Sequence, residues 1–203
     1  LITPWNFPIA IPIWKMAPAL VYGNTVILKP ASATPHIGTL IARMWEAVDL
    51  PAGVFNLVTG AGRAVGNELI TNAKVAAISF TGSTRVGMNI ASEAAQRGKR
   101  YQLEMGGKNP VIVLPDADLE QAAEITVSGA MKYSGQKCTA TSRAIVVGNI
   151  MEEFTNLVVE KTNALKIGSG SDPDSIIVPV IDQASKDNIT SMIARGVADG
   201  GSV

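Results

Sequence analysis

The sequence predicts a folded α/β protein built on parallel β-strands, and three observations support this fold class. Hydrophobic residues make up 47% of the 203 residues and charged residues only 17%, which is typical of chains that bury a core. Short apolar runs alternate with longer segments of helical periodicity. The runs are continuously apolar, as expected for parallel strands covered by helices on both faces.

The elements follow in order along the chain, each bounded by turn residues. In the first half we expect strands at 26–28, 54–58, 75–80 and 101–104, and helices at 36–47, 64–71 and 84–96. Paired glycines, Gly106 and Gly107, indicate a hinge and a soft domain boundary. Beyond them we expect strands at 111–114 and 144–147, a helix from an Asp118 cap to about residue 133, and a helix at 151–165.

The composition excludes several classes of function. Lys plus Arg and Asp plus Glu both number 17, so no basic surface for nucleic acid is indicated. A single cysteine and a single histidine exclude an intramolecular disulfide and a zinc site of known spacing, and they favour a reducing, cytoplasmic compartment. Lys15 and three prolines interrupt the most apolar stretch, 7–23, which is too short to span a membrane, and no signal peptide is found.

The two ends of the sequence indicate an internal piece of a longer protein. The chain opens at Leu1 rather than Met and ends at 200–203, where a turn is expected to lead into a further strand.

A glycine-rich turn at 81–87 is a candidate anion site. Gly82 and Gly87 lie between an expected strand and an expected helix, where backbone N–H groups and a helix N-terminus attract a phosphate. It is not a P-loop, because Met88 and Asn89 stand where Lys and Ser or Thr are required. The alternative is a plain tight turn, and the turn at 60–66 is a weaker candidate of the same kind.

Cys138 is a candidate nucleophile. Free cysteines are most often buried and structural, but the neighbours here are polar, and Lys137 and a possible helix start would favour the thiolate. A serine hydrolase is unsupported, because His36 is the only histidine available as a base and no nucleophile elbow is present. No metal site is expected.

Three further polar residues have a functional and a structural interpretation. Glu104, at the end of a strand, suits a general base or an ordinary salt bridge. Asn6 suits an oxyanion donor or a turn. Lys29, also at a strand end, suits a ribose or phosphate ligand or a surface charge.

Five motifs in order resemble the aldehyde dehydrogenase superfamily, and the resemblance covers essentially the whole chain. They are PWNFP at 4–8, LKPAS at 28–32, FTGST at 80–84, LEMGGKNP at 103–110 and GQKC at 135–138. The resemblance implies a Rossmann-like NAD(P)-binding domain at 1–106 and, at 107–203, the start of an α/β catalytic domain that carries the thiol.

The resemblance also implies a chemistry. Cys138 would attack an aldehyde, the Asn6 amide and the Cys138 N–H would stabilise the oxyanion, and Glu104 would activate the water that hydrolyses the thioester. Members that transfer the acyl group to coenzyme A typically lack this glutamate, so release of a free carboxylic acid is expected.

The cofactor implied by the resemblance is NADP or NAD. Lys29 and Ser32 would contact the adenosine ribose, Trp5 and Ser83 the pyrophosphate, and Met105 the nicotinamide. The full set of cofactor residues implied is Trp5, Asn6, Lys29, Pro30, Ala31, Ser32, Gly82, Ser83, Gly87 and Met105. Members that prefer NAD commonly carry an acidic residue at the position of Ser32, so this neutral hydroxyl predicts that NADP is accepted.

The stretch 135–143 resembles semialdehyde dehydrogenases, particularly those acting on 2-oxoglutarate semialdehyde and secondarily on succinate semialdehyde. The resemblance implies a small aldehyde substrate and a homodimer or homotetramer. Two alternatives stay open: a truncated nucleotide-binding relative without oxidation activity, and a thiol-dependent esterase that needs no cofactor.

Overall fold

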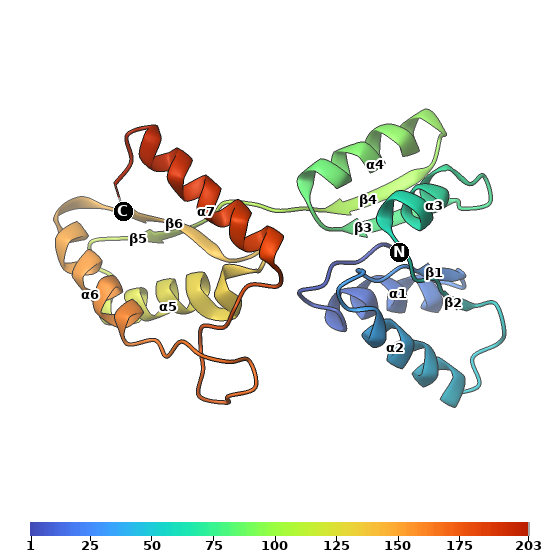
Figure 1. Cartoon of the computed structure of the whole chain (residues 1–203), viewed down its shortest axis with the longest axis horizontal. Helices are drawn as coiled ribbons and strands as arrows, with labels where there is room; N and C mark the ends of the chain where they lie inside the picture. Colours follow the sequence, from blue (N-terminus) through green and yellow to red (C-terminus); the bar gives the residue numbers. More distant parts are fainter. Residues whose placement is uncertain (203) are drawn as a thin grey trace. The chain divides into compact units, whose positions relative to one another are not determined.

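The computed structural model describes residues 1–202, and the chain divides into two compact units, 1–106 and 107 to the end (Figure 1). Val203, the last residue of the second predicted domain, lies outside the described residues. Every strand pair in the described part of the chain is parallel. The predicted α/β class with parallel strands is therefore confirmed.

The first unit is a layer of short parallel strands connected by helices. Its elements are α1 (Ala10–Val21), β1 (Val26–Leu28), α2 (Pro35–Ala47), β2 (Phe55–Leu57), α3 (Asn67–Thr71), β3 (Ala77–Thr81), α4 (Thr84–Gln96) and β4 (Arg100–Glu104). β1 pairs with β2 and β3 with β4. Ile2 forms parallel bridges to both Lys29 and Phe80, so residues 1–3 lie between β1 and β3.

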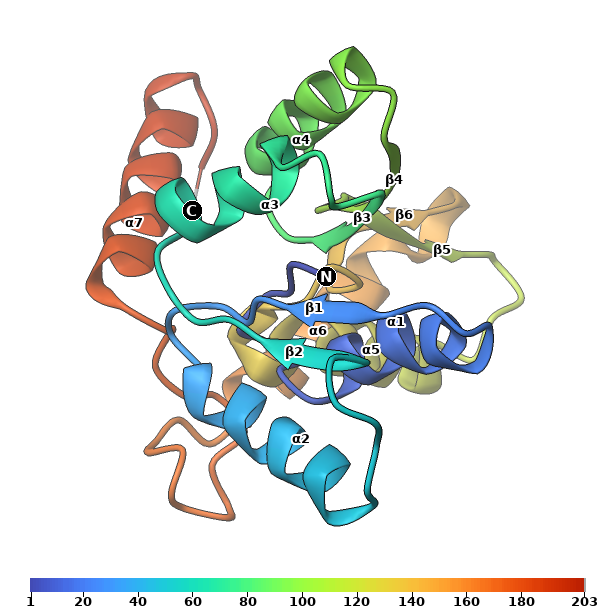
Figure 2. The same cartoon turned by 90° about the vertical axis from the view of Figure 1, so that its right-hand side faces the viewer.

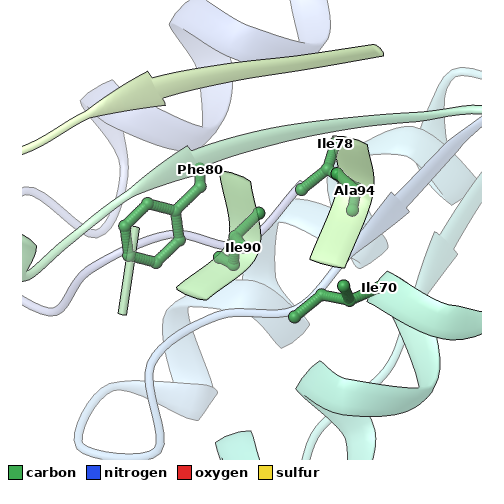
Figure 3. Packing of buried hydrophobic residues seen from close by; sticks show 5 residues of the cluster. All are labelled: Ile70, Ile78, Phe80, Ile90 and Ala94. Atoms are coloured by element: carbon green, nitrogen blue, oxygen red, sulfur yellow. The ribbon is translucent and has the colours of Figure 1, made fainter. Parts of the chain in front are cut away.

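Helices α3 and α4 pack on one face of β3 and β4, whereas the other face of β4 carries the exposed residues Arg100, Gln102 and Glu104, so the predicted covering of both faces does not hold for β4 in the described chain. Ile78 and Phe80 of β3 pack against Ile90 and Ala94 of α4 and Ile70 of α3 (Figure 3). Ser79 lies between them in the strand and faces the opposite side. There it accepts a hydrogen bond from Lys15 of α1 at 2.8 Å.

A second cluster holds β1 and β2 against their helices. Val26 and Leu28 of β1 pack with Met16 of α1 and Ile41 of α2, and all four side chains are buried. In two perpendicular views α2 lies beside β2 (Figures 1 and 2). The strands are thus placed by burial of their apolar side chains between helices.

The second unit contains one parallel strand pair and three α-helices. Its elements are β5 (Asn109–Val113), α5 (Leu119–Met131), a 3₁₀ turn (Lys132–Gly135), β6 (Thr141–Val146), a 3₁₀ turn (Gly148–Ile150), α6 (Met151–Asn163) and α7 (Gln183–Ala198). Its core joins Val113, Ala123 and Phe154. The Asp118 carboxylate accepts from Gln121 N at 3.0 Å, so the predicted helix cap is confirmed.

Two helices were missed by the sequence analysis. Prolines obscured α1, although Pro12 lies in the first turn, where its missing N–H is not needed, and Pro18 is accommodated inside the helix. α7 has no buried residue in the described structure, so it lacks a clear apolar face that would predict a helix. Its N-terminus is capped by the Asp182 carboxylate, which accepts a hydrogen bond from Ser185 N at 2.7 Å.

Several strand boundaries differ by one to three residues from the predicted ones. The largest difference is at the last strand, which was predicted to begin at 144, whereas β6 begins at Thr141 because polar residues 141–143 pair with the start of β5. Backbone pairing does not require apolar side chains at the edge of a core, which is why the polar residues escaped prediction.

Replacing Ile90 by alanine tests the packing of α4 on β3. The side chain is 0% exposed, so Ile90→Ala should lower the free energy of unfolding by about 3 kcal/mol. The matched control Met88→Ala, on the exposed side of the same helix, should cost less than about 0.5 kcal/mol. Urea unfolding followed by circular dichroism measures both, and equal losses would contradict the packing described.

Candidate active site and cofactor-binding edge

Several of the predicted site residues lie at the carboxyl ends of the first unit's strands. Lys29 follows β1, Gly82 and Ser83 follow β3, and Glu104 ends β4. Trp5 and Asn6 lie in the half-buried bend that follows residues 1–3. Carboxyl ends of parallel strands meet at one edge, which is where α/β proteins bind ligands.

Lys29 is a buried cation without a carboxylate partner. The residue is 4% exposed, its ammonium donates to Pro30 O at 3.0 Å, and no ion pair among the described residues includes it. Burial lowers the pKa of Lys29 below its ordinary value. A buried charge of this kind is costly unless a ligand compensates it.

Two buried hydroxyls near Lys29 also lack hydrogen-bond partners within the described chain. They are Thr3 Oγ1 and Thr34 Oγ1. Thr3 is the neighbour of Lys29 in the layer, since Thr3 N donates to Lys29 O at 3.2 Å. Thr34 is the last residue of the loop between β1 and α2, and its side chain does not form a capping hydrogen bond to α2. The sequence analysis selected neither threonine, because nothing in their local pattern marks an unpaired hydroxyl.

The loop between Lys29 and Thr34 carries the other predicted ribose contacts. Pro30 is buried, Ala31 is half-buried and Ser32 is exposed. The Ser32 hydroxyl donates a hydrogen bond to Gly60 O at 3.4 Å, and Gly60 lies in the loop that follows β2. Ser32 therefore presents a neutral polar group to solvent beside a buried cation.

The turn after β3 is shaped by its two glycines. A Cβ atom on Gly82 would lie 2.5 Å from Cζ of Phe80, and one on Gly87 would lie 2.5 Å from Sδ of Met105. Ser83 caps α4, its hydroxyl accepting from Val86 N at 3.4 Å. Glycine at these two positions therefore allows close packing against Phe80 and Met105, and the N-terminus of α4 that follows Ser83 suits a phosphate.

Glu104 is exposed and belongs to a hydrogen-bonded chain of side chains. Its Oε1 accepts from Gln102 Nε2 at 2.8 Å. Gln102 Oε1 in turn accepts from Lys15 Nζ at 3.0 Å and from Ser79 Oγ at 2.6 Å. Burial lowers the pKa of Lys15, and the Glu104 charge partly opposes that shift. Glu104 was predicted from its motif, whereas its partner Gln102 and the two donors to Gln102, Lys15 and Ser79, were not.

Asn6 has an oriented amide. Its Oδ1 accepts from Phe7 N at 3.1 Å, which identifies the oxygen end of the side chain as the one facing the backbone. An oxyanion donor needs the opposite, N–H₂ end of such an amide.

Cys138 is exposed on a turn that precedes β6, so the expectation of a helix start at this residue is wrong. The helical segment ends before it, at Gly135, through three consecutive left-handed residues: Tyr133 with φ 60°, Ser134 with φ 54° and Gly135 with φ 70°. Two non-glycine residues in this region store backbone strain, a feature that clusters at functional sites.

Hydrogen bonds within the second unit hold this turn. Asn109 Nδ2 donates to Cys138 O at 2.7 Å and to Ala140 O at 3.1 Å. Gln136 Oε1 accepts from Ile181 N at 2.9 Å. Asn109 was part of a recognised motif, but its clamp on the two carbonyls depends on tertiary contacts and was not predicted.

The described residues contain a cavity away from these strand ends. It has a volume of about 500 Å³ and is lined near the amino ends of β1, β3 and β4 by Val26, Ala77 and Arg100 among others. None of the predicted cofactor residues lines it, but Lys15, Ser79 and Gln102, the side chains that lead to Glu104, do. No cluster of metal-ligating side chains occurs in residues 1–202, and no helix there is long and apolar enough to cross a membrane.

The described chain is thus an α/β protein with polar residues at the carboxyl edge of its parallel strands, followed by a second α/β unit with an exposed cysteine on a strained turn. The chain belongs to the aldehyde dehydrogenase family, whose model matches residues 1–203.

Relatives with known names agree with this family. The chain is 51% identical over 203 residues to an alpha-ketoglutaric semialdehyde dehydrogenase of Bacillus subtilis, covering 100% of this chain and 42% of the relative. It is 44% identical over 213 aligned residues to an alpha-ketoglutarate semialdehyde dehydrogenase of Haloferax volcanii, covering 100% of this chain and 44% of the relative. The chain thus spans less than half the length of these curated relatives.

Solved structures confirm the fold. The betaine aldehyde dehydrogenase of Staphylococcus aureus in complex with NAD⁺ superposes with a TM-score of 0.96 at 36% identity, covering 100% of this chain and 40% of that one. A 3,6-anhydro-L-galactose dehydrogenase in complex with NADP gives a TM-score of 0.94 at 40% identity, covering 98% of this chain and 42% of that one.

Replacing Lys29 by methionine tests whether its buried charge is kept for a ligand. Lys29→Met should raise the free energy of unfolding of the unliganded protein by about 1 kcal/mol at pH 7. Methionine has a side chain of similar length to lysine but carries no charge, so the substitution removes a buried cation that has no carboxylate partner. The same change should weaken NADP binding at least about tenfold. Urea unfolding and calorimetric titration measure the two effects.

The pH dependence gives a further readout of the same variant. In the folded chain the pKa of Lys29 is lowered from its ordinary value of 10.5. Between the folded-state pKa and the unfolded-state pKa, the unfolded chain therefore binds more protons than the folded chain. The free energy of unfolding of the unsubstituted protein rises with pH through that interval. The advantage of Lys29→Met should therefore shrink from pH 7 to pH 10. The exposed Lys74→Met serves as control, and an equal gain from it would contradict the interpretation.

Proposed function

We propose that the full-length protein oxidises a dicarboxylic semialdehyde to the carboxylic acid with NADP or NAD. The observation that carries the proposal is that a chain matched from end to end by the family exposes Cys138 on a clamped turn and retains Asn6 and Glu104. Residues 1–106 would bind the cofactor and residues 107–203 would carry the nucleophile.

The first step of the proposed reaction forms a bond from Cys138 Sγ to the aldehyde carbon. The carbonyl electron pair moves onto oxygen, and the Asn6 N–H₂ group and the Cys138 N–H donate to that oxyanion. The contact between Asn6 Oδ1 and Phe7 N supports this role, because it orients the amide. The chemistry that a bound nicotinamide supplies is acceptance of a hydride from the same carbon, which leaves a thioester on Cys138.

Glu104 would act in the second step. Its carboxylate takes a proton from water as the water oxygen attacks the thioester carbon, and the carbon–sulfur bond then breaks to release the carboxylic acid and the Cys138 thiolate. A carboxylate at the exposed end of β4 is accessible to water, which supports this role.

The cofactor edge fits a nicotinamide dinucleotide. Lys29 offers a buried cation without a carboxylate partner, and the buried hydroxyls of Thr3 and Thr34 lack hydrogen-bond partners in the described chain. The turn at Gly82 and Ser83 offers a helix N-terminus to a pyrophosphate. Two structural relatives are solved with NAD⁺ and with NADP. The neutral Ser32 beside Lys29 supports acceptance of the 2′-phosphate of NADP.

The substrate proposal rests on the named relatives. Two of them, from a bacterium and an archaeon, are semialdehyde dehydrogenases named for alpha-ketoglutarate. We therefore expect 2-oxoglutarate semialdehyde as the preferred substrate and succinate semialdehyde as the second. A homodimer or homotetramer in the cytoplasm remains part of the proposal.

Cofactor reduction by the full-length gene product tests the function. NADPH and NADH formation is followed with 2-oxoglutarate semialdehyde, succinate semialdehyde and a simple aliphatic aldehyde. Cys138→Ala should lower the rate by about 10³-fold or more, because it removes the proposed nucleophile. The exposed Ser171→Ala should leave it unchanged. Absence of cofactor reduction with every aldehyde would overturn the proposal.

An esterase activity is the second candidate, favoured by the exposure of the Cys138 thiol. It needs the nucleophile and the oxyanion donors but no nucleotide. Ester hydrolysis that continues at full rate without NADP, with no aldehyde oxidation, would identify it. Nucleotide binding without either activity would identify the truncated binding relative.

Replacing Ser32 by glutamate tests the cofactor preference. A carboxylate at this position should repel the 2′-phosphate, so Ser32→Glu should raise the ratio of kcat/KM for NAD over that for NADP by about tenfold or more. Ser32→Gln, of similar size but neutral, should change the ratio much less. Comparable ratios in the unsubstituted protein and in Ser32→Glu would refute the prediction.

A further inference from the structure

We propose that Gln102 is a positioning residue for Glu104, and that it acts in hydrolysis of the thioester rather than in its formation. The inference rests on the proposed function and adds to it a residue that the motifs do not mark. The structure supports it through strand geometry, through the direction of the Gln102 amide and through the anchor at its other end.

Strand geometry places Gln102 beside Glu104. The two residues are separated by one position in β4, so their side chains leave the same face of the strand. Leu103 between them packs toward the core of Phe80 and Ile90. In the parallel pair, Gln102 lies in register with Ser79, which also faces away from that core.

The direction of the Gln102 amide follows from its partners. Its oxygen accepts hydrogen bonds from Lys15 Nζ at 3.0 Å and from Ser79 Oγ at 2.6 Å. The Lys15 ammonium can only donate hydrogen bonds. Turning the amide over would place its N–H₂ group against the ammonium of Lys15. The N–H₂ group is therefore directed to Glu104 Oε1, at 2.8 Å.

The anchor of this arrangement is held by further contacts. Lys15 also donates to Ser79 Oγ at 2.8 Å and to Phe80 O at 3.3 Å, so its ammonium is tied to β3. The amide dipole of Gln102 then lies between a cation at its oxygen end and an anion at its nitrogen end. Both ends are charge-assisted hydrogen bonds, which are stronger than neutral ones.

This arrangement has a consequence for a general base. A glutamate side chain loses rotamer entropy when it is ordered. Gln102 orders Glu104 before any water arrives, and it occupies Oε1 while Oε2 is the oxygen left to accept the water proton. Attack of Cys138 on the aldehyde does not use Glu104 in this scheme, so formation of the thioester should not depend on Gln102.

Gln102→Met in the full-length protein separates these steps. Methionine keeps the length of the side chain, but it cannot donate a hydrogen bond to Glu104 and lacks the amide oxygen that accepts hydrogen bonds from Lys15 and Ser79. We expect a rapid burst of one reduced cofactor per active site at the unsubstituted rate, followed by a steady-state rate that is lower by about tenfold or more. The KM for aldehyde in the burst phase should change less than about threefold.

Two variants calibrate this result. Ser79→Ala removes one of the two donors to the Gln102 oxygen without touching β4, and it should lower the steady-state rate by a smaller factor, again with an intact burst. Gln96→Met makes the same chemical change on the exposed surface of α4, where Gln96 Nε2 donates to Ser92 Oγ, and it should change neither phase. If Gln102→Met fails to fold, as shown by its melting curve, Ser79→Ala decides.

The outcomes distinguish this inference from the proposed function. A steady-state rate within twofold of the unsubstituted protein, or a loss shared equally by burst and steady state, overturns the role of Gln102 and leaves the dehydrogenase intact. Absence of cofactor reduction by the unsubstituted protein overturns both together. A preserved burst with a slowed steady state, graded from Gln102→Met to Ser79→Ala, supports the inference.

Discussion

The parallel pairing of residues 1–3 with strands on both sides is the constraint on which the first unit depends. Ile2 forms parallel bridges to Lys29 and to Phe80, so residues 1–3 link β1 and β3 with all three segments running in the same direction. Because the strands are parallel, their polar ends emerge at one edge, and their apolar side chains enter helical clusters on the faces. The same pairing that buries the core therefore assembles the candidate cofactor edge.

At that edge the structure carries groups that stability alone does not explain. Lys29 is a buried cation, and the hydroxyls of Thr3 and Thr34 are buried without partners in the described chain. In the second unit, Tyr133 and Ser134 adopt left-handed backbone just before the cysteine turn. Unsatisfied polar groups and strain are tolerated where the surrounding packing over-determines them, and they are typical of sites that await a ligand or hold a reactive group.

The two candidate reactive side chains are held in different ways. Glu104 is positioned through a side chain, Gln102, whose own direction is set by Lys15. Cys138 is positioned through its backbone, because Asn109 donates to the Cys138 carbonyl and leaves the thiol exposed. A base that must accept a proton benefits from an ordered carboxylate, whereas a nucleophile that must approach a carbon benefits from a fixed backbone with an accessible sulfur.

By itself the sequence determined the α/β class and most of the elements, because apolar periodicity is a local property of the chain. Its ordered motifs also marked Asn6, Glu104 and Cys138 as candidate site residues. It did not predict α1, whose prolines are tolerated only in their actual positions, or α7, which lacks a buried face. Only the tertiary structure decided that Lys29 lacks a carboxylate partner, that Lys15 and Ser79 anchor the Gln102 amide beside Glu104, and that Asn109 holds the Cys138 turn. These anchoring contacts join residues 23 to 87 positions apart, and no local pattern encodes which side chains meet across such separations.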